Sequence, residues 1–346
     1  MTDRPDPARR HLVQLLFGFY PLRVMHTLVT LAVPEHLVKA PAGTVDDLAE
    51  ATGTHAPSLR RLLRASAGLG LVRHGADGTV SLTDLGRLLH PDTAGSVRNL
   101  TLLWGGEEGS RAWGRLADSI RTGEIAYEQV VGQSLFDHLA ENPEQQLVFN
   151  HAMAESSRVA AGGILAVCPL GEYREILDVG GGSGSLLAVL LGAHPQLRGV
   201  LFDRPGGVAD AQDVLDEAGV LDRGTVVCGD FFESVPTGAD CYLMKSVLHD
   251  WDDDRCVRIL VNCAAAMGPQ TPLYIIEPVV PVEDTDLMAE QVMLVSDLNM
   301  LVCTGGVERS QPEFEQLLAR AGLVLDRVTR CPAPSNLSVI RVVRSG

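Results

Sequence analysis

The feature that most constrains the fold is a glycine-rich run placed directly after a short apolar segment. Residues 176–179 read Ile-Leu-Asp-Val and lead into Gly-Gly-Gly-Ser-Gly at 180–184, and an apolar helical pattern follows from Leu186 to Leu191. A strand that turns through glycines into a helix is typical of the first βα turn of a doubly wound sheet, where nucleotide-type ligands bind. The glycines permit a tight turn and let a ligand approach the backbone closely.

Short strand-like and helix-like runs alternate after residue 175. This alternation predicts a parallel sheet covered by helices on both faces. Two further strand-like runs, 323–330 and 337–343, are expected to pair antiparallel at one edge. The fold class is therefore α/β, a Rossmann-like doubly wound sheet with an antiparallel edge strand. The earlier strand-like runs are 175–179, 199–202, 225–228, 241–244 and 273–276, and the helix-like runs are 186–191, 208–218, 256–267 and 314–321.

The first part of the chain has a different pattern. Residues 8–37 are helical and more apolar than a lone surface helix needs, which suggests burial against another chain or domain, or an ordinary core helix. Two short helices at 44–53 and 56–69 and a hairpin at 71–82 resemble a winged helix-turn-helix. We therefore predict a mainly helical winged-helix dimerisation domain over residues 1–96. A helical connector over 97–160 and the catalytic domain over 161–346 follow it.

Charge and cysteine content exclude several classes of function. The 346 residues include 28 basic and 44 acidic side chains, a net charge of −16 that repels nucleic acid, although Arg60, Arg61 and Arg64 fall in the second short helix. There is no uninterrupted apolar run of the roughly 18 residues expected of a membrane span, and no secretory signal is indicated. The seven cysteines lack a Cys-x-x-Cys pair and are expected to be reduced, mostly buried thiols. A cytoplasmic protein with no nucleic-acid or membrane partner is predicted.

The glycine turn favours a nucleoside cofactor over a dinucleotide. A dinucleotide fingerprint needs a further glycine five residues after Gly180, where this chain has Ser185. Asp178 would repel a pyrophosphate but suits a cofactor with a positively charged end. Asp203 ends the next strand, where its oxygens could accept from both ribose hydroxyls, and Asp230-Phe231 follows the third strand, where a carboxylate and a ring could hold adenine.

A histidine follows the fourth strand at the same edge of the sheet. Residues 241–251 read Cys-Tyr-Leu-Met-Lys-Ser-Val-Leu-His-Asp-Trp, which places His249 near the cofactor. A phenol has a pKa of about 10 and attacks poorly until a base removes its proton, a task that suits histidine. Glu277 ends the fifth strand, close enough to orient the imidazole. Acidic residues at 250 and 252–254 could suggest a metal site with His249, but carboxylates are expected at a helix N-terminus, so no metal is predicted.

These motifs together resemble the plant caffeate-type O-methyltransferases and their bacterial natural-product relatives. The similarity runs over essentially the whole chain, and the motifs stand in the family's order. They are residues 178–184, Leu201-Phe202-Asp203-Arg204-Pro205, Gly229-Asp230-Phe231-Phe232, Lys245 with Leu248-His249-Asp250-Trp251, and Gly305-Gly306-Val307-Glu308-Arg309.

The resemblance implies S-adenosylmethionine as methyl donor, an intertwined homodimer, and a small phenolic or polyketide-type metabolite as acceptor. It implies His249 as general base with Glu277 and Glu308 beside it. The expected cofactor contacts are Ser157, Asp178, Gly180, Gly182, Asp203, Asp230, Phe231 and Lys245, and the expected acceptor contacts are Phe149, Met153 and Asp250. Two other functions stay open from the sequence: a cofactor-binding homologue that catalyses hydroxylation or a pericyclic reaction, and a DNA-binding regulator.

Overall fold

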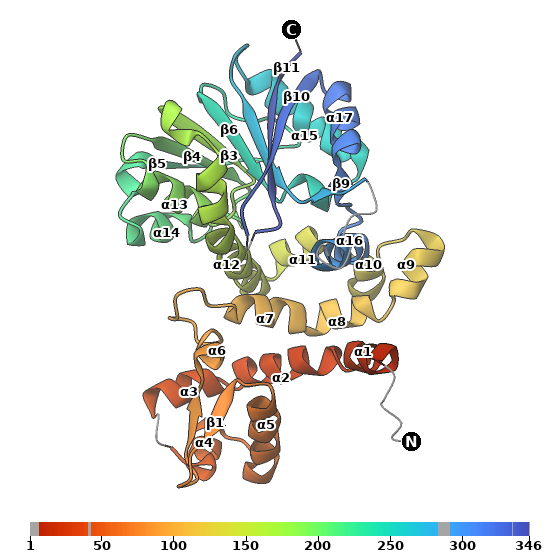
Figure 1. Cartoon of the computed structure of the whole chain (residues 1–346). Coiled ribbons are helices and arrows are strands. Elements are labelled where there is room, and N and C mark those ends of the chain that lie inside the picture. The colour runs from red at the N-terminus through yellow and green to blue at the C-terminus, as the bar shows by residue number, and fades with distance from the viewer. Residues whose placement is uncertain (1–6, 41–42, 283–290, 334, 346) are drawn as a thin grey trace. The chain divides into compact units, whose positions relative to one another are not determined.

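The chain forms two compact units, Met1–Ser110 and Arg111–Gly346 (Figure 1). A computed structural model describes residues 7–40, 43–282, 291–333 and 335–345. The sequence predicts boundaries at residues 96 and 160, with a dimerisation domain, a connector and a catalytic domain. This three-part division and its assigned roles stay predictions.

The N-terminal unit begins with helices where one long helical stretch was predicted. Two interruptions divide the stretch: a turn at residues 17–18, and Ala32, whose φ of 52° lies in the left-handed region. The resulting helices are α1 Pro7–Leu16, α2 Phe19–Thr30 and α3 Val33–Lys39. Taken together as one stretch, α1 and α2 (Pro7–Thr30) are long and apolar enough to cross a membrane, a test that signal sequences and core helices of soluble proteins also pass.

The winged helix-turn-helix elements predicted from the sequence are present. Thr44 caps α4 (Val45–Thr52) in a reciprocal capping box with Asp47, and the helix ends at the left-handed Gly53. Leu28, Leu63 and Val80 lie at the centre of the core of this unit, each at most 1% exposed. The remaining elements are α5 Ala56–Gly68, β1 Val72–His74, β2 Val80–Leu82, α6 Asp84–Arg87 and α7 Arg98–Gly105, and α8 Glu107–Trp113 crosses into the second unit.

A seven-stranded sheet forms the centre of the second unit, with strand order β10-β11-β7-β6-β3-β4-β5. Strands β7, β6, β3, β4 and β5 are parallel, and β11 runs antiparallel to β7 and β10. The predicted antiparallel pair at one edge is therefore present, with β10 outermost. The strands are β3 Glu175–Val179, β4 Arg198–Asp203, β5 Gly224–Cys228, β6 Cys241–Lys245, β7 Leu273–Glu277, β10 Leu323–Arg330 and β11 Ser338–Arg344.

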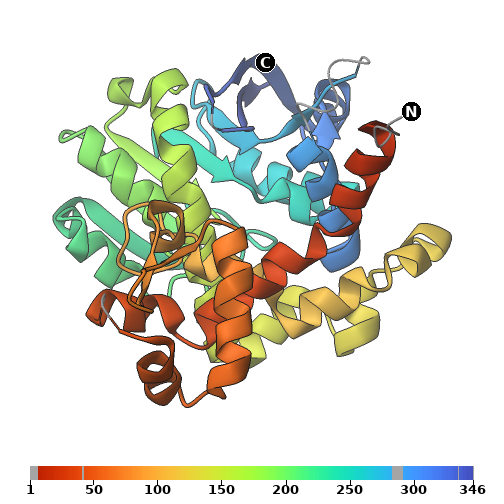
Figure 2. The ribbon, with the colours of Figure 1, turned by 60° about the horizontal axis from the view of Figure 1, so that its bottom comes forward.

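Helices cover both faces of the sheet, as the near-continuous apolar strands predict (Figures 1 and 2). Alternate strand residues supply two separate cores. One core joins α15 (Asp253–Ala266) and α17 (Gln311–Arg320) to the sheet, and the other joins α12 (Pro143–Val167), α13 (Ser185–Ala193) and α14 (Ala211–Glu217) to it. Between Arg111 and α12 lie α9 Leu116–Thr122, α10 Ala126–Val131 and α11 Leu135–Glu141, as the helical connector predicted.

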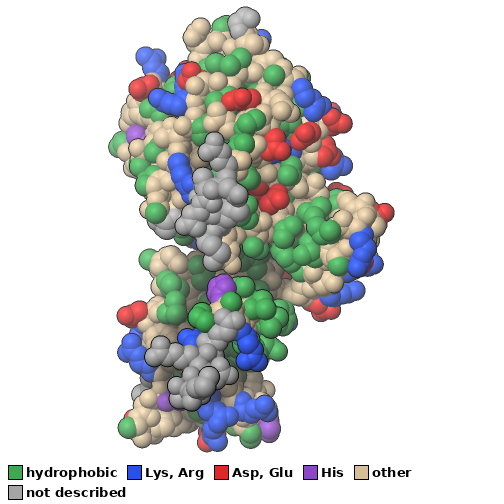
Figure 3. Space-filling model, turned by 45° about the vertical axis from the view of Figure 1, so that its right-hand side comes forward, with side chains coloured by type: hydrophobic (Ala, Val, Ile, Leu, Met, Phe, Trp, Pro, Cys, Tyr) green, Lys and Arg blue, Asp and Glu red, His purple; other side chains and the backbone are tan. Residues whose placement is uncertain are grey.

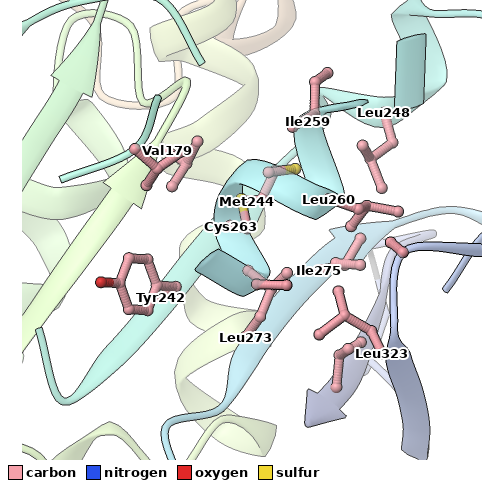
Figure 4. Close-up of a cluster of buried hydrophobic side chains, with 14 of the residues drawn as sticks. Val179, Tyr242, Met244, Leu248, Ile259, Leu260, Cys263, Leu273, Ile275 and Leu323 are labelled. Atoms are coloured by element: carbon pink, nitrogen blue, oxygen red, sulfur yellow. The ribbon is translucent and has the colours of Figure 1, made fainter. Parts of the chain in front are cut away.

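The first of these cores extends to the end of the sheet where the site is expected. Leu248, one residue before His249, is fully buried with Leu260 and Ile275 (Figure 4). The chain order reverses between β3 and β6, which are neighbours although β4 and β5 come between them in sequence. Such a switch point opens a crevice at the carboxyl ends of the strands, where ligands of doubly wound sheets bind.

Two features differ from the expectations or were missed. Helix α16 (Gln291–Cys303) was not predicted, although its sequence is an apolar helical run. The cysteines are free, and five of the seven are buried as expected, but Cys228 is exposed and Cys303 is only partly buried. Cys228 ends the edge strand β5, where one side of the strand has no neighbour.

Candidate active site

The glycine turn after β3 adopts backbone angles that favour glycine. Gly180 and Gly182 have φ values of 70° and 57°, in the left-handed region. A Cβ atom on Gly180 would lie 2.8 Å from the Val247 side chain and 3.5 Å from the ring of Phe231. The turn, the loop after β6 and Phe231 are therefore in close contact.

Asp178 is a buried carboxylate without a partner. Its side chain is 1% exposed, and neither carboxylate oxygen has a hydrogen-bond partner among the described residues. Burial, and to a smaller extent the charge of Asp203, raise its pKa to about 7, while Lys245 opposes the shift. An unpaired buried charge is costly. The position suits a positively charged ligand group, as the sequence predicted.

Asp203 and Asp230 lie at the ends of neighbouring strands and are held by backbone N–H groups. Asp203 accepts from Gly182 N at 2.8 Å and from Arg204 N at 2.6 Å, one bond on each oxygen. Asp230 accepts from Phe232 N at 2.7 Å. Each carboxylate oxygen has more than one acceptor direction, so these bonds fix the side chains and leave capacity for ligand hydroxyl or amino groups.

Lys245 ends β6 between the glycine turn and the loop that carries His249. Its ammonium donates to the Ser246 hydroxyl at 3.2 Å. Burial lowers its pKa, while Glu277, Asp178 and Asp250 raise it. Lys245 is thus a partly buried cation between the acidic groups on both sides of β6.

Strand β7 and the segment before α17 bring two carboxylates to His249. Its Nδ1 lies 3.0 Å from Glu308 Oε1 and 3.5 Å from Glu277 Oε2. The other Glu277 oxygen accepts from Val247 N at 2.9 Å and from Leu248 N at 3.0 Å. The shorter contact therefore comes from Glu308, which reasoning from the residues alone did not single out, and Glu277 mainly holds the backbone of the loop.

The acidic groups around His249 change the pKa of its imidazole ring. Burial lowers the pKa of His249, but Glu277, Asp250 and Glu308 raise it by more, so that it reaches about 10. Burial also raises the pKa of Asp250, to about 6, with His249 opposing. Without bound ligands, the cluster therefore holds His249 as an imidazolium at neutral pH.

The same cluster offers a set of metal-ligand atoms. One atom each from His249, Glu277 and Glu308 lies within 4.8 Å of the others. Asp252, Asp253 and Asp254, which the sequence set beside His249, instead lie at the start of α15, where Asp252 caps the helix through Arg255 N. The prediction that the protein uses no metal is not tested by this geometry.

Three predicted contacts share one face of α12. Phe149, Met153 and Ser157 are spaced by four residues, so they lie along the same side of the helix, and each is partly buried. The Phe149 ring packs edge-to-face on Phe136 with centroids 6.1 Å apart. Their assigned roles in binding remain predictions.

The structure adds groups from α16 that the sequence did not suggest. The Ser296 hydroxyl donates to Glu308 Oε1 at 3.2 Å, and Asp297 accepts from Glu308 N at 2.8 Å. The sequence signal that could have indicated these residues is a pair of polar side chains, Ser296 and Asp297, within an otherwise apolar helical run.

A cavity of about 390 Å³ opens beside Asp230, Phe232 and Trp251 and extends to the end of α16 at Cys303. Trp251 stacks on Phe136 with centroids 5.2 Å apart and an interplanar angle of 27°.

Comparisons with known proteins decide the family. Residues 113–324 match the model of an O-methyltransferase domain, and residues 13–92 match that of an O-methyltransferase dimerisation domain. The chain belongs to the O-methyltransferase family. The family, the fold and the enzyme class predicted from the sequence are confirmed.

Two relatives of this O-methyltransferase are methyltransferases from Streptomyces, one of them named for mitomycin biosynthesis. The mitomycin biosynthesis 6-O-methyltransferase of Streptomyces lavendulae is 40% identical over 337 residues, 96% of this chain and 95% of the relative. The 8-amino-8-demethylriboflavin N,N-dimethyltransferase of Streptomyces davaonensis is 35% identical over 326 residues, 93% and 92% of the two chains.

A solved structure extends the similarity to a complex. NcsB1, an O-methyltransferase from neocarzinostatin biosynthesis, has a TM-score of 0.77 and 34% identity, covering 94% of this chain and 96% of the other. It was crystallised with S-adenosylmethionine and 2-hydroxy-5-methyl naphthoic acid.

Asp178→Asn should stabilise the cofactor-free protein while weakening cofactor binding. The carboxyl pKa rises from 3.8 in the unfolded chain to about 7 in the fold, so folding stability falls as pH rises through this window and the full penalty is present above it. The amide removes that penalty. Thermal unfolding at pH 8 should therefore shift up by a few degrees, and by less at pH 5.5. An equal shift at both values would contradict the charge argument.

Proposed function

We propose that this chain transfers a methyl group from S-adenosylmethionine to a phenolic hydroxyl of a small aromatic or polyketide-type secondary metabolite, with His249 as general base. The observation that carries the proposal is the 3.0 Å contact between His249 Nδ1 and Glu308, beside the glycine turn. A hydroxyl must lose its proton before it attacks efficiently. A histidine oriented by a carboxylate supplies that function.

The cofactor expected from the sequence, S-adenosylmethionine, is supported by the family match and by the complex of NcsB1. The residues at the switch point fit it. Asp178 would meet the ammonium group, Asp203 the ribose hydroxyls, and Asp230 with Phe231 the adenine. When bound, S-adenosylmethionine supplies an electrophilic methyl group whose departure from sulfur needs neither acid nor metal. Gly180, Gly182, Lys245 and Ser157 complete the proposed contacts.

The tautomer of His249 follows from its partner. An ionised Glu308 only accepts hydrogen bonds, so Nδ1 donates to it and Nε2 is left to take the acceptor's proton. Both carboxylates then stabilise the imidazolium that forms. Because the pKa of His249 reaches about 10, it is a strong base, but only a small fraction is neutral at pH 7.

The acceptor is proposed to bind between His249 and α12. Phe149 and Met153 present an aromatic and an apolar side chain on one face of that helix, and Asp250 adds a polar contact beside the base. A flat aromatic ring fits such a lining.

One observation bears on the choice between oxygen and nitrogen acceptors. A relative is named as an N,N-dimethyltransferase. A neutral aryl amine already has a lone pair for attack, whereas a phenol must be deprotonated. The buried cluster of His249, Glu277 and Glu308 therefore favours a hydroxyl.

Replacing His249 by alanine should abolish most methyl transfer without abolishing cofactor binding. A general base contributes about 10²–10⁴-fold, so turnover of labelled S-adenosylmethionine with a panel of phenols should fall by that factor. The dissociation constant for S-adenosylmethionine should change by less than about threefold. His74→Ala, at an exposed histidine of β1, is the control.

The identity of the product decides between the alternatives. Mass spectrometry should find a methylated phenol. Full turnover by His249→Ala would exclude the general-base assignment. Preferred turnover of a matched aryl amine would favour N-methylation, and a product without an added methyl group would favour the non-methylating alternative.

Glu308→Gln should move the pH profile to lower pH. The negative charge of Glu308 stabilises the imidazolium, so its removal lowers the pKa of His249 from about 10. The neutral base then forms at lower pH. The pH midpoint of kcat/KM should therefore decrease, measured with the same acceptor as for the parent. Glu315→Gln removes the same charge at an exposed site of α17 and should leave the midpoint in place. An unchanged midpoint in Glu308→Gln would refute the coupling.

We further propose that the protein is a homodimer joined through its N-terminal unit. Large apolar side chains of the first two helices and the turn between them are exposed, and hydrophobic groups are visible on the surface in Figure 3. Patches of this kind mark association surfaces, and the dimerisation-domain match covers most of them. The exposed residues are Leu12, Val13, Leu15, Leu16, Phe17, Phe19 and Tyr20.

The double variant Leu16→Glu/Phe19→Glu should be monomeric. These side chains are 70% and 59% exposed, so the charges cost the isolated chain little but disfavour an apolar interface. Light scattering coupled to gel filtration should give twice the 37.0 kDa chain mass for the parent and the single mass for the variant. Arg61→Glu, at an exposed position of α5, should stay dimeric. A monomeric parent would contradict the proposal.

A further inference from the structure

We infer that Arg309 is a positioning residue that holds the loop carrying His249 in its working geometry. This inference rests on the proposed function, because Arg309 is assigned an effect on the reaction through His249. Arg309 belongs to the short strand β9 (Arg309–Ser310) and is 2% exposed.

The guanidinium binds the loop on both sides of His249. It donates to Leu248 O at 3.0 Å through Nη1 and to Trp251 O at 2.8 Å through Nη2. These carbonyls belong to the residue before His249 and to the residue that follows Asp250. The planar, forked guanidinium can reach two separated acceptors at once.

The charge of Arg309 acts mainly on this loop. Its carboxylate partner, Asp253, accepts from Nε at 3.2 Å and from Nη2 at 2.9 Å, but the Asp253 side chain is 61% exposed. A surface carboxylate is well screened by water and stabilises a buried cation weakly. The backbone carbonyls are therefore essential partners of the buried charge, and hydrogen bonds from a charged donor are stronger than neutral ones.

The residues before Arg309 bind the same loop. Val307 N donates to His249 O at 2.9 Å, and Glu308 accepts from the imidazole. Gly306 lies so close that a Cβ atom would collide with His249 O. Val307 thus binds the carbonyl of His249, Glu308 binds its ring, and Arg309 binds the carbonyls of residues 248 and 251.

Glu277 binds the N–H groups of the same loop. Its Oε1 accepts from Val247 N and Leu248 N, so a buried carboxylate holds the N–H groups of the loop and a buried guanidinium holds its carbonyls. Removing one of the two should let the loop shift. The His249–Glu308 separation would then no longer be fixed at hydrogen-bond length.

The alternative role for Arg309 is a purely structural ion pair that joins β9 to the start of α15 through Asp253. The two roles predict different results for two variants. Arg309→Lys keeps a cation near Asp253 but replaces the two nitrogens of the planar fork, which bind Leu248 O and Trp251 O separately, by one nitrogen. Asp253→Asn removes the ion pair and keeps both carbonyl bonds.

The test measures turnover in the full-length protein with the phenol that the parent methylates fastest. We expect Arg309→Lys to lower kcat at least about tenfold with little change in acceptor KM or in S-adenosylmethionine affinity. Asp253→Asn should stay within about threefold of the parent. Arg320→Lys, which alters an exposed ion pair with Asp254 between α17 and α15, is the matched control. Equal losses in Arg309→Lys and Asp253→Asn would overturn the inference.

A second readout follows His249 itself. Histidine-selective NMR of the protein with S-adenosylhomocysteine bound gives the pH midpoint of the His249 ring without any turnover. In Arg309→Lys this midpoint should decrease, because a loosened contact with Glu308 stabilises the imidazolium less. A midpoint identical to the parent's would overturn the inference. Loss of the proposed function is separate: it would appear as full turnover by His249→Ala.

Cys256→Ala keeps the test decisive if Arg309→Lys does not fold. The Cys256 Sγ lies 3.1 Å from Leu248 O and 3.4 Å from Trp251 O, so its single S–H can donate to either of the same two carbonyls, and alanine removes this donor. We expect a smaller decrease of the His249 midpoint in the same direction. No decrease would show that these carbonyls do not position the ring.

Discussion

The site depends on one buried carboxylate, Glu277, which binds the backbone of the loop after β6. Its Oε1 accepts from two successive N–H groups, and its Oε2 lies 3.5 Å from His249 Nδ1. One side chain therefore shapes the loop and contributes charge to the histidine that the loop carries. The apolar core beneath, which includes Leu248, keeps water away from these bonds and strengthens them.

Most of the fold could be predicted from the sequence because its signals are local. Apolar strands alternate with helical runs, and turn glycines and capping residues such as Thr44 mark their ends. The break at Ala32 was missed because a non-glycine residue with positive φ gives no sequence signal. Helix α16 was missed because two polar residues, Ser296 and Asp297, interrupt its apolar pattern. Their presence makes sense only in the fold, where both contact Glu308.

The sequence was sufficient to predict which strand ends carry the acidic groups of the site. Strand order places Asp178, Asp203 and Asp230 along one edge, as expected of a parallel sheet. Which carboxylate makes the shorter contact with His249 was not predictable. The distances from His249 Nδ1 to Glu277 and to Glu308 differ by less than an ångström, and only the folded structure sets them. Arg309 was likewise hidden: an arginine near a helix start suggests a surface residue, and only the folded loop shows that its charge is buried.

The pairing of β11 has a consequence for how the protein is made. Ser338, the first residue of β11, pairs with Glu277, and β11 separates β7 from the outer strand β10. Strand β7 therefore has no outer neighbour until residues 338–344 have been synthesised. Up to that point in synthesis, Glu277 lies on an unpaired edge of the sheet. A change that displaces β11 would consequently act on the site through the strand that carries Glu277, although β11 itself holds none of the proposed site residues.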